Sequence, residues 1–351
     1  MSKINLGVIF GGQSTEHKIS TMSGMSVVEH LNNKKYNVFP IYIDKDGNWY
    51  EYKTTQDMSD DVELSIKIYS KSKIKNIITY LQELDIVFPV LHGKYGEDGA
   101  IQGLLEILQI PYVGCGILAS SIGMDKIYTK AILEKAGINQ AKYCYIKIEK
   151  GEYYYIEKDF EETKTTIKEI IKKVKEKLNF PVFVKPSNSG SSIGINKAHN
   201  KKELEQAIEE AAEYDTKILI EENIQGKEIE CAILQIDQTI ASCTGEIIPA
   251  EEYYTFDAKY NNSKSKLKIP SEIECEPQIQ KLAIKAFKAI NAKGLARVDF
   301  FVTKEEDIYL NEINTMPGFT TISMYPKLWE RTGINYTELL DKLIESTIKK
   351  S

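Results

Sequence analysis

The sequence LARVDFFV, at Leu295–Val302, is followed after four residues by DIYLNEIN, at Asp307–Asn314. Both stretches alternate apolar and polar side chains, a period of two that is typical of strands. The polar run Lys304-Glu305-Glu306 separates them. This stretch therefore predicts a β-hairpin with one chemically distinctive face.

The side chains on that face predict a cation site. A hairpin through the polar run sets Asp299 opposite Glu312 and Arg297 opposite Asn314. Cross-strand neighbours lie about 4.5–5.5 Å apart at Cβ, where two carboxylates repel each other. A hard divalent cation relieves this repulsion, and Mg²⁺ held by one or two carboxylates plus substrate phosphates fits the residues. The alternative is a solvated hairpin edge that carries acids.

Length and composition limit the class of protein. The 351 residues predict two or three domains, and 42% hydrophobic with 27% charged residues is typical of soluble globular chains. The net charge of −6 gives no support for nucleic-acid or anionic-membrane binding. No apolar run approaches the roughly 20 residues that span a bilayer. Five scattered cysteines and an N-terminus without a signal-peptide pattern lead us to expect a cytoplasmic protein.

The order of predicted elements indicates an α/β chain. Residues 3–113 alternate strand and helix, which predicts a parallel sheet covered by helices. A helix over Asp125–Ala136 opens a second part that contains several strands. The part from residue 223 onward, which ends in the acidic hairpin and a helix, reads as α+β. The loop Pro249–Lys266 is long enough to be functional.

Two glycine-rich loops follow predicted parallel strands of the first part. Gly11–Glu16 lies between a strand and a helix, where backbone N–H groups attract a carboxylate or phosphate. Glu16 is alternatively a first-turn acid that complements the helix dipole. Leu91–Gly99 follows a buried strand at the sheet edge where open α/β sheets bind ligands. His92 in this loop is a candidate ligand-binding group, although a lone histidine is more often structural.

Two further motifs indicate phosphate and oxyanion chemistry. Val184–Gly194 places Lys185 at a strand end before a loop rich in hydroxyl groups, which suits phosphate oxygens. Lys126 is a possible second cation, and a polar turn is the alternative reading. The stretch Thr315–Phe319 directly follows Asn314, and its Pro-Gly turn could aim the Gly318 N–H at developing negative charge.

Taken together, these motifs resemble the D-alanine–D-alanine ligase family of the ATP-grasp superfamily over essentially the whole chain. In chain order they are GGxSxE, LHGxxGEDG, MDK, VKPxxxGSSxG, the AKY loop, RVD and NExNTxPGxT. The resemblance implies a Rossmann-like N-terminal domain (1–122) and a two-subdomain ATP-grasp fold (123–222 and 223–351). It also implies an ATP site between the two subdomains.

The resemblance further implies roles for individual residues. The catalytic set that it implies is Glu16, Ser191, Tyr260, Arg297 and Gly318. The implied substrate-binding residues are His92, Lys259, Ser323 and Met324. ATP is expected to contact Lys126, Lys185, Glu221, Glu222, Ile224 and Glu228. Two Mg²⁺ or Mn²⁺ ions are expected on Asp299, Glu312 and Asn314. Glu222 departs from the lysine of many relatives, which puts that adenine contact in doubt.

The implied reaction joins two D-alanines through an acyl phosphate, with ATP as co-substrate, for peptidoglycan precursor synthesis. A homodimer is expected from the family. The first alternative is a variant ligase that takes D-serine or D-lactate as second substrate. Tyr260 argues against D-lactate, and Met324 argues less firmly against D-serine. The second alternative is a non-catalytic nucleotide sensor, which would be expected to lose a metal ligand or the oxyanion arginine.

Overall fold

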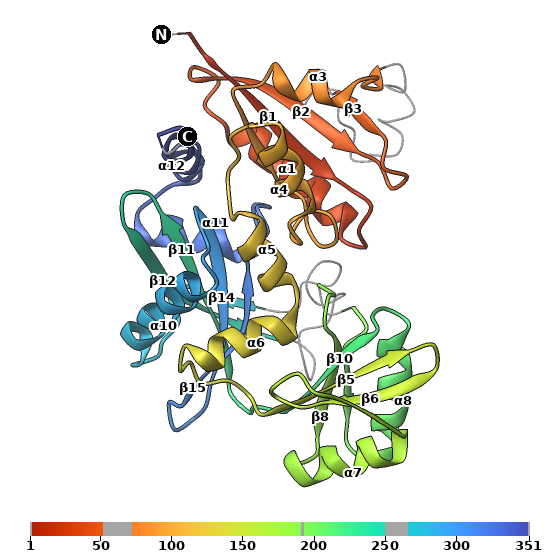
Figure 1. Cartoon of the computed structure of the whole chain (residues 1–351). Helices are drawn as coiled ribbons and strands as arrows, with labels where there is room; N and C mark the ends of the chain where they lie inside the picture. Colours follow the sequence, from red (N-terminus) through yellow and green to blue (C-terminus); the bar gives the residue numbers. More distant parts are fainter. Residues whose placement is uncertain (1, 52–71, 191–192, 250–265, 350–351) are drawn as a thin grey trace.

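The chain folds into three β-sheets with helices packed against them. The computed structural model describes residues 2–51, 72–190, 193–249 and 266–349, which form sheets of four, six and five strands (Figure 1). We call these the N-terminal, central and C-terminal sheets. The predicted α/β class, with a parallel-sheet part first and two further parts after it, is confirmed.

The N-terminal sheet is mainly parallel, in the order β3-β2-β1-β4. β1 (Ile4–Gly11) pairs in parallel with β2 (Tyr36–Ile43) and β4 (Ile86–Pro89), and β3 (Trp49–Glu51) is antiparallel to β2. Its helices are α1 (His17–His30), α3 (Ile77–Gln82) and α4 (Ala100–Ile107). β4 is buried along its whole length, as expected for a parallel strand with both faces covered.

The alternation of strand and helix over residues 3–113 predicts a last strand at residues 110–114, and this prediction is wrong in extent. Only an isolated parallel bridge forms there, between Tyr112 and Val87. Val87 donates its N–H to Pro111 O at 2.9 Å, and Val113 donates to Val87 O at 2.9 Å. Because Pro111 itself has no N–H to donate, the ladder does not extend further back along the chain.

The central sheet is antiparallel, in the order β7-β6-β5-β10-β8-β9. Its strands are β5 (Tyr143–Glu149), β6 (Glu152–Ile156), β7 (Glu162–Thr165), β8 (Val182–Pro186), β9 (Asn196–Ala198) and β10 (Lys217–Glu222). Helices α7 (Ile167–Lys177) and α8 (Lys201–Ala212) share its hydrophobic core. Thr166 and Asn200 cap these helices with side-chain oxygens that accept first-turn N–H groups.

The C-terminal sheet carries the predicted hairpin at one edge, in the order β13-β12-β11-β14-β15. Its strands are β11 (Lys227–Gln235), β12 (Thr239–Ile248), β13 (Lys266–Lys268), β14 (Leu295–Val302) and β15 (Ile308–Asn314). Helix α10 (Glu276–Ala289) buries Ile279, Ala283 and Phe287 against this sheet, a spacing of four residues that keeps them on one helix face.

Helices α5 (Ile117–Met124) and α6 (Lys126–Lys135) connect the N-terminal sheet to the rest of the chain. Asp125 caps α6 by accepting the N–H groups of Ile127 and Tyr128. Ile127 packs with residues of the central sheet, whereas Leu133 belongs to the core under the C-terminal sheet. α6 therefore touches both walls of the space between these two sheets.

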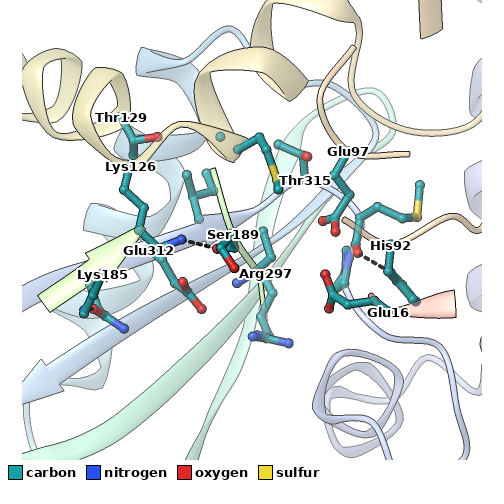
Figure 2. Close-up of a pocket in the computed structure, with 18 of the residues that line it drawn as sticks. Glu16, His92, Glu97, Lys126, Thr129, Lys185, Ser189, Arg297, Glu312 and Thr315 are labelled. Atoms are coloured by element: carbon teal, nitrogen blue, oxygen red, sulfur yellow. Dashed lines mark hydrogen bonds between the residues drawn. The ribbon is translucent and has the colours of Figure 1, made fainter. Parts of the chain in front are cut away.

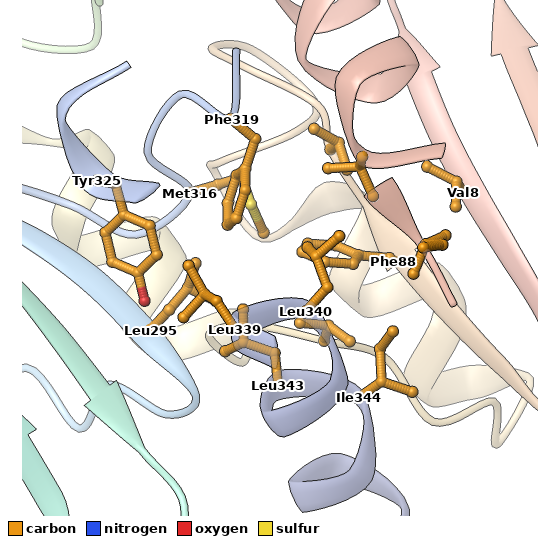
Figure 3. Close-up of a cluster of buried hydrophobic side chains, with 14 of the residues drawn as sticks. Val8, Phe88, Leu295, Met316, Phe319, Tyr325, Leu339, Leu340, Leu343 and Ile344 are labelled. Carbon is orange, nitrogen blue, oxygen red and sulfur yellow. The ribbon is translucent and has the colours of Figure 1, made fainter. Parts of the chain in front are cut away.

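The last two helices, α11 (Met324–Thr332) and α12 (Tyr336–Ile348), fasten the two ends of the chain together. Figure 3 shows Leu339, Leu340 and Leu343 of α12 beside Phe88 of β4. The same core holds Phe319 from the loop after β15 and residues of the C-terminal sheet. This core fixes the N-terminal sheet against the loop that carries the predicted oxyanion turn.

Among the helices that the structure describes, none combines the length and the apolar character needed to cross a membrane.

Candidate active site

Two adjoining cavities collect the predicted site residues. The smaller, of about 90 Å³, is lined by Glu16 and His92 from the N-terminal part and by Arg297 of β14. The larger, of about 820 Å³, lies along the central and C-terminal sheets. Both cavities are lined by Lys126, Lys185, Glu221, Arg297, Glu312 and Gly318. They therefore form one continuous site with two ends.

Every predicted residue within the described ranges lines one of these cavities. Asn314 joins Glu16 and His92 in the smaller one. The larger one also includes Glu222, Ile224, Glu228, Asp299, Ser323 and Met324. Ser191, Lys259 and Tyr260 lie outside the residues that the structure describes. Figure 2 shows Lys126, Lys185 and Glu312 on one side of Arg297, with Glu16, His92 and Glu97 on the other.

Three carboxylates lie abreast across neighbouring strands of the C-terminal sheet. Asp299 of β14 pairs with Glu312 of β15 on one side and with Glu230 of β11 on the other. Arg297 pairs with Asn314, so the predicted hairpin register is confirmed. Directly opposed residues point to the same face of a sheet, which places all five side chains on the face that lines the larger cavity or its margin.

Arg297 holds this acidic row together. Its Nε and Nη2 donate to the two oxygens of Asp299 at 2.8 and 2.7 Å, and Nε lies 2.9 Å from Glu230 Oε2. Asn314 Nδ2 donates to Asp299 Oδ2 at 3.0 Å. Burial alone would lower the pKa of Arg297, but Asp299 and then Glu230 raise it well above its ordinary value. The guanidinium is therefore always charged.

The donor set of this row fits magnesium rather than a softer metal. Asp299 and Glu312 offer carboxylate oxygens, and Asn314 keeps its amide oxygen available because its nitrogen donates to Asp299. Within the described ranges, no group of three or more His, Cys, Asp or Glu side chains is arranged to hold a metal alone. A set of two carboxylates and one amide instead suits an ion that completes its shell with phosphate oxygens and water.

Cationic side chains face the acidic row from α6 and the central sheet. Lys185 Nζ lies 2.6 Å from Glu221 Oε2, and Lys130 Nζ lies 2.5 Å from Glu221 Oε1. Lys126 donates to the backbone carbonyl of Ser189, and burial lowers its pKa. These ammonium groups place positive charge where the two cavities meet.

Glu221 is a carboxylate between two lysines. Glu221 is only 4% exposed, and burial alone would raise the pKa of its carboxyl group. The charges of Lys130 and Lys185 outweigh burial and lower the pKa of Glu221 to about 2. A permanently ionised Glu221 accepts hydrogen bonds and donates none.

The end of the smaller cavity farthest from the lysines is acidic. Gly93 N–H donates to Glu97 Oε2 at 2.7 Å. Burial, and then the neighbouring charge of Glu16, raise the pKa of Glu97. A side-chain carbon built on Gly190 would collide with the Glu16 carboxylate, so the loop needs glycine there to approach so closely. This end suits a cationic group such as an ammonium.

His92 contacts protein groups through both ring nitrogens. Nδ1 lies 3.1 Å from Met316 O, and Nε2 lies 3.0 Å from Ser23 Oγ. Burial lowers the pKa of His92 to about 4, so the ring is neutral near pH 7. The imidazole therefore links helix α1 to the loop after β15.

The loop after β15 brings together three of the predicted residues, Gly318, Ser323 and Met324. Ser323 Oγ lies 2.7 Å from Thr320 Oγ1 and accepts the Thr320 N–H at 3.1 Å. A side-chain carbon built on Gly318 would lie 2.7 Å from Ser323 Oγ. Met324 is buried next to this pair and adds an apolar surface.

The far end of the larger cavity is formed by the segment that joins β10 to β11. Glu222, Ile224 and Glu228 line it, together with Phe183 and Phe301. Glu222 Oε1 accepts the N–H of Lys142 at 2.8 Å. An aromatic and aliphatic wall with a few acidic acceptors suits a planar base and a sugar.

Comparison with protein families assigns the chain. A family model described as "D-ala D-ala ligase C-terminus" matches residues 132–345, and one described as "D-ala D-ala ligase N-terminus" matches residues 5–115. The chain belongs to the D-alanine–D-alanine ligase family.

Curated members of this family match over nearly the full length. The D-alanine–D-alanine ligase of Acetivibrio thermocellus is 48% identical, covering 98% of this chain and 95% of that protein. The D-alanine–D-alanine ligase of Clostridium acetobutylicum is 47% identical, covering 98% of this chain and 97% of that protein.

Solved ligase structures share the whole fold. The VanG D-Ala:D-Ser ligase of Enterococcus faecalis has a TM-score of 0.84 at 35% identity, covering 99% of this chain and all of that one. The D-alanine–D-alanine ligase of Coxiella burnetii has a TM-score of 0.83 at 33% identity, covering 100% of this chain and 95% of that one.

Sequence reasoning missed four residues that the structure places in or against the site. Lys130 lies one helical turn after Lys126, a spacing that would have put both on one helix face. Glu230 lies two residues after Glu228 on the same strand face. Glu97 belongs to the quoted glycine-rich loop. Ser23 carried no local signal.

Proposed function

We propose that this ligase-family chain joins two D-alanines, with consumption of ATP, to give D-alanyl-D-alanine, ADP and phosphate for peptidoglycan precursors. The observation that carries the proposal is the acidic row of Asp299 and Glu312, with Arg297 paired to Asp299, facing Lys126 and Lys185 across shared cavity walls. This arrangement suits a polyphosphate on one side and an amino acid on the other.

The reaction follows from the weakness of a carboxylate as an electrophile. An oxygen of the first D-alanine carboxylate attacks the γ-phosphorus of ATP, and the bond to the β-phosphate oxygen breaks to release ADP. The free amine of the second D-alanine then attacks the carbonyl carbon of the acyl phosphate. The C–O bond to phosphate breaks, phosphate leaves with the bridging oxygen, and the amine loses its proton.

The nucleotide roles are assigned from the larger cavity. Lys126 and Lys185 neutralise phosphate oxygens as point charges. Glu221, which Lys130 and Lys185 keep ionised, accepts a hydrogen bond from the exocyclic amine of adenine. Ile224 packs against the base, and Glu228 accepts hydrogen bonds from the ribose hydroxyls. Glu222 bonds to the Lys142 backbone, so we assign it to the wall of the adenine pocket rather than to a direct contact.

Asp299, Glu312 and Asn314 would hold two Mg²⁺ or Mn²⁺ ions. When bound, such ions neutralise the phosphate charge that develops during transfer. Asp299 and Glu230 neutralise the Arg297 guanidinium and keep it charged. That charged group would serve as a hydrogen-bond donor to the oxyanion of the second step.

The amino-acid substrates are assigned to the opposite end. Glu16 receives the ammonium of the first D-alanine, in an end of the cavity that is already acidic. His92 borders the same subsite. Gly318 N–H and Arg297 face the tetrahedral oxyanion. Ser323 binds the carboxylate of the second amino acid beside the apolar Met324.

Ser191, Lys259 and Tyr260 complete the proposal from the family resemblance. Ser191 and Tyr260 would form a hydrogen-bonded triad with Glu16, and Lys259 would contact substrate. We further propose a homodimer in the cytoplasm, with functional units at 1–122, 123–222 and 223–351.

A D-alanine–D-serine ligase is the second candidate, favoured by the likeness to the VanG enzyme. A pocket lined by Met324 cannot strongly reject one added hydroxyl. Dipeptide formation from D-alanine alone, and from D-alanine plus D-serine, decides between them. We expect D-alanyl-D-alanine with equimolar ADP and phosphate from D-alanine alone. Products containing serine at equal substrate concentrations would favour the variant, and no ADP with any amino acid would indicate a sensor.

A further inference from the structure

We propose that Ser23 and His92 are positioning residues that aim the Gly318 N–H at the reaction's oxyanion. This inference deepens the proposed ligase function and rests on it. Both residues belong to the N-terminal part of the chain, whereas the turn that they hold, Met316–Phe319, follows β15 of the C-terminal sheet. The N-terminal part then does more than bind the first substrate.

The hydrogen bonds form one directed chain. Met316 O can only accept, so His92 Nδ1 carries the proton and donates to it at 3.1 Å. In a neutral ring Nε2 is then an acceptor, and it receives the Ser23 hydroxyl at 3.0 Å. Ser23 Oγ in turn accepts the Phe319 N–H at 3.2 Å. Each hydrogen bond has one possible direction, which fixes the tautomer of His92 and the orientation of the Ser23 hydroxyl.

The chain grips the turn on both sides of Pro317-Gly318. The Met316 carbonyl is held before the turn, and the Phe319 N–H is held after it. The half-buried Glu97 carboxyl group accepts the Met316 N–H as well. Pro317 has no N–H and a fixed φ, which removes further freedom. The peptide that carries the Gly318 N–H is therefore clamped from both neighbours.

Burial makes these bonds costly to lose. Ser23 and Phe319 are 0% exposed, and His92 and Met316 are each 4% exposed. No bulk water can replace a lost partner at such depth. The Phe319 ring also packs edge-on against Phe88 of the N-terminal sheet, with centroids 5.5 Å apart. Figure 2 shows the His92 contact to this loop close to Glu16 and Glu97.

A shift of the turn would act on the transition state rather than on substrate binding. An oxyanion donor stabilises negative charge that exists only in the tetrahedral species. Loss of one such donor typically lowers kcat by about 100- to 1,000-fold. Loosening its support without removing it should cost less, and we expect a fall of about 10- to 100-fold for Ser23→Ala.

Ser20→Ala is the matched control. Ser20 lies one helical turn earlier on α1 and is also 0% exposed. Like Ser23, it donates one hydrogen bond and accepts one: its hydroxyl donates to Val90 O at 2.6 Å and accepts the Gly11 N–H at 2.8 Å. Those partners lie in β1 and directly after β4, away from the turn. Ser20→Ala should lower the unfolding midpoint as Ser23→Ala does, but keep kcat within about 3-fold of wild type.

The test measures kcat, KM for ATP and D-alanine, and the inhibition constant of a tetrahedral phosphinate analogue of the dipeptide. For Ser23→Ala we expect kcat to fall and the phosphinate constant to rise by similar factors, with KM values within about 3-fold. A kcat and phosphinate constant equal to those of Ser20→Ala would overturn the inference. A change confined to KM for D-alanine would overturn it too, because it would indicate substrate binding.

A second pair of variants covers the case in which Ser23→Ala does not fold. The His92→Asn amide reaches the position of Nδ1 and keeps the donor to Met316 O, whereas His92→Ala keeps nothing. We expect His92→Asn to recover at least about 10-fold of the kcat lost in His92→Ala. Equal kcat for the two overturns the inference. Wild-type protein that forms no D-alanyl-D-alanine overturns the proposed function itself.

Discussion

Replacing Glu221 by glutamine should destabilise the protein strongly, because it removes the negative charge between two lysines. Lys130 and Lys185 lie 2.5 and 2.6 Å from the two carboxylate oxygens. The Lys130 side chain is only 3% exposed. After the substitution its ammonium stays buried without a counter-charge. Breaking a buried ion pair by removing one partner typically costs about 3–5 kcal/mol.

The pKa of Glu221 gives a second measure of the same interaction. It falls from 4.5 to about 2, against the effect of burial. Each pKa unit corresponds to about 1.4 kcal/mol, so the ionised carboxylate contributes about 3 kcal/mol. A lowered folded-state pKa contributes stability above the ordinary carboxyl pKa, and this contribution is lost as pH falls toward 2. The effect of Glu221→Gln should therefore be largest near neutral pH.

Urea denaturation followed by circular dichroism at pH 7 and pH 3 tests this reasoning. We expect Glu221→Gln to lose about 3 kcal/mol at pH 7 and clearly less at pH 3. Glu222→Gln is the control, since its carboxylate accepts the Lys142 backbone N–H, a hydrogen bond that an amide oxygen can keep, and it should lose under about 1 kcal/mol. Adding Lys130→Met to Glu221→Gln should recover stability. A loss below about 1 kcal/mol at pH 7, or one independent of pH, would refute the account.

Three further substitutions test other parts of the site. Asp299→Asn should lower kcat by at least about 100-fold and should weaken Mn²⁺ binding, measured by electron paramagnetic resonance. Its circular dichroism spectrum should stay unchanged. An unchanged Mn²⁺ affinity would contradict the metal assignment. Glu230→Gln removes the ion pair between Glu230 and Arg297, so we expect about 1.5–3 kcal/mol less stability in urea and a lower kcat. An unaltered urea midpoint would argue against the ion pair. Glu97→Gln should flatten the pH dependence of stability. Because burial and the charge of Glu16 raise the pKa of Glu97, the wild-type protein loses stability as pH rises above the ordinary carboxyl range. The variant should not show this loss. Parallel pH profiles for the two proteins would exclude that explanation.

The sequence predicted the local part of the site well. Period-two alternation and a short polar turn were enough to place Asp299 opposite Glu312. That prediction works because a hairpin register depends only on residues close in the chain. The loops after β1 and β4 were also found, since both end parallel strands at one edge of the N-terminal sheet.

What the sequence did not reveal depends on contacts between distant segments. Glu230 joins the acidic row because β11 lies beside β14, and strand order is not encoded in either strand alone. Ser23 touches the oxyanion turn, almost 300 residues away in the chain, because α12 and Phe319 pack the two ends together. Lys130 differs, because its helical spacing from Lys126 was visible and only its buried partner was not.

Transfer of oxygen from substrate to phosphate tests the central claim most directly. Wild-type protein would be incubated with ATP, Mg²⁺ and D-alanine carrying ¹⁸O in both carboxylate oxygens, and the inorganic phosphate analysed by mass spectrometry. Activation of the carboxylate by phosphorylation predicts one ¹⁸O in each phosphate released. It also predicts ADP as the nucleotide product. Phosphate free of label, or AMP and pyrophosphate in place of ADP and phosphate, would contradict it.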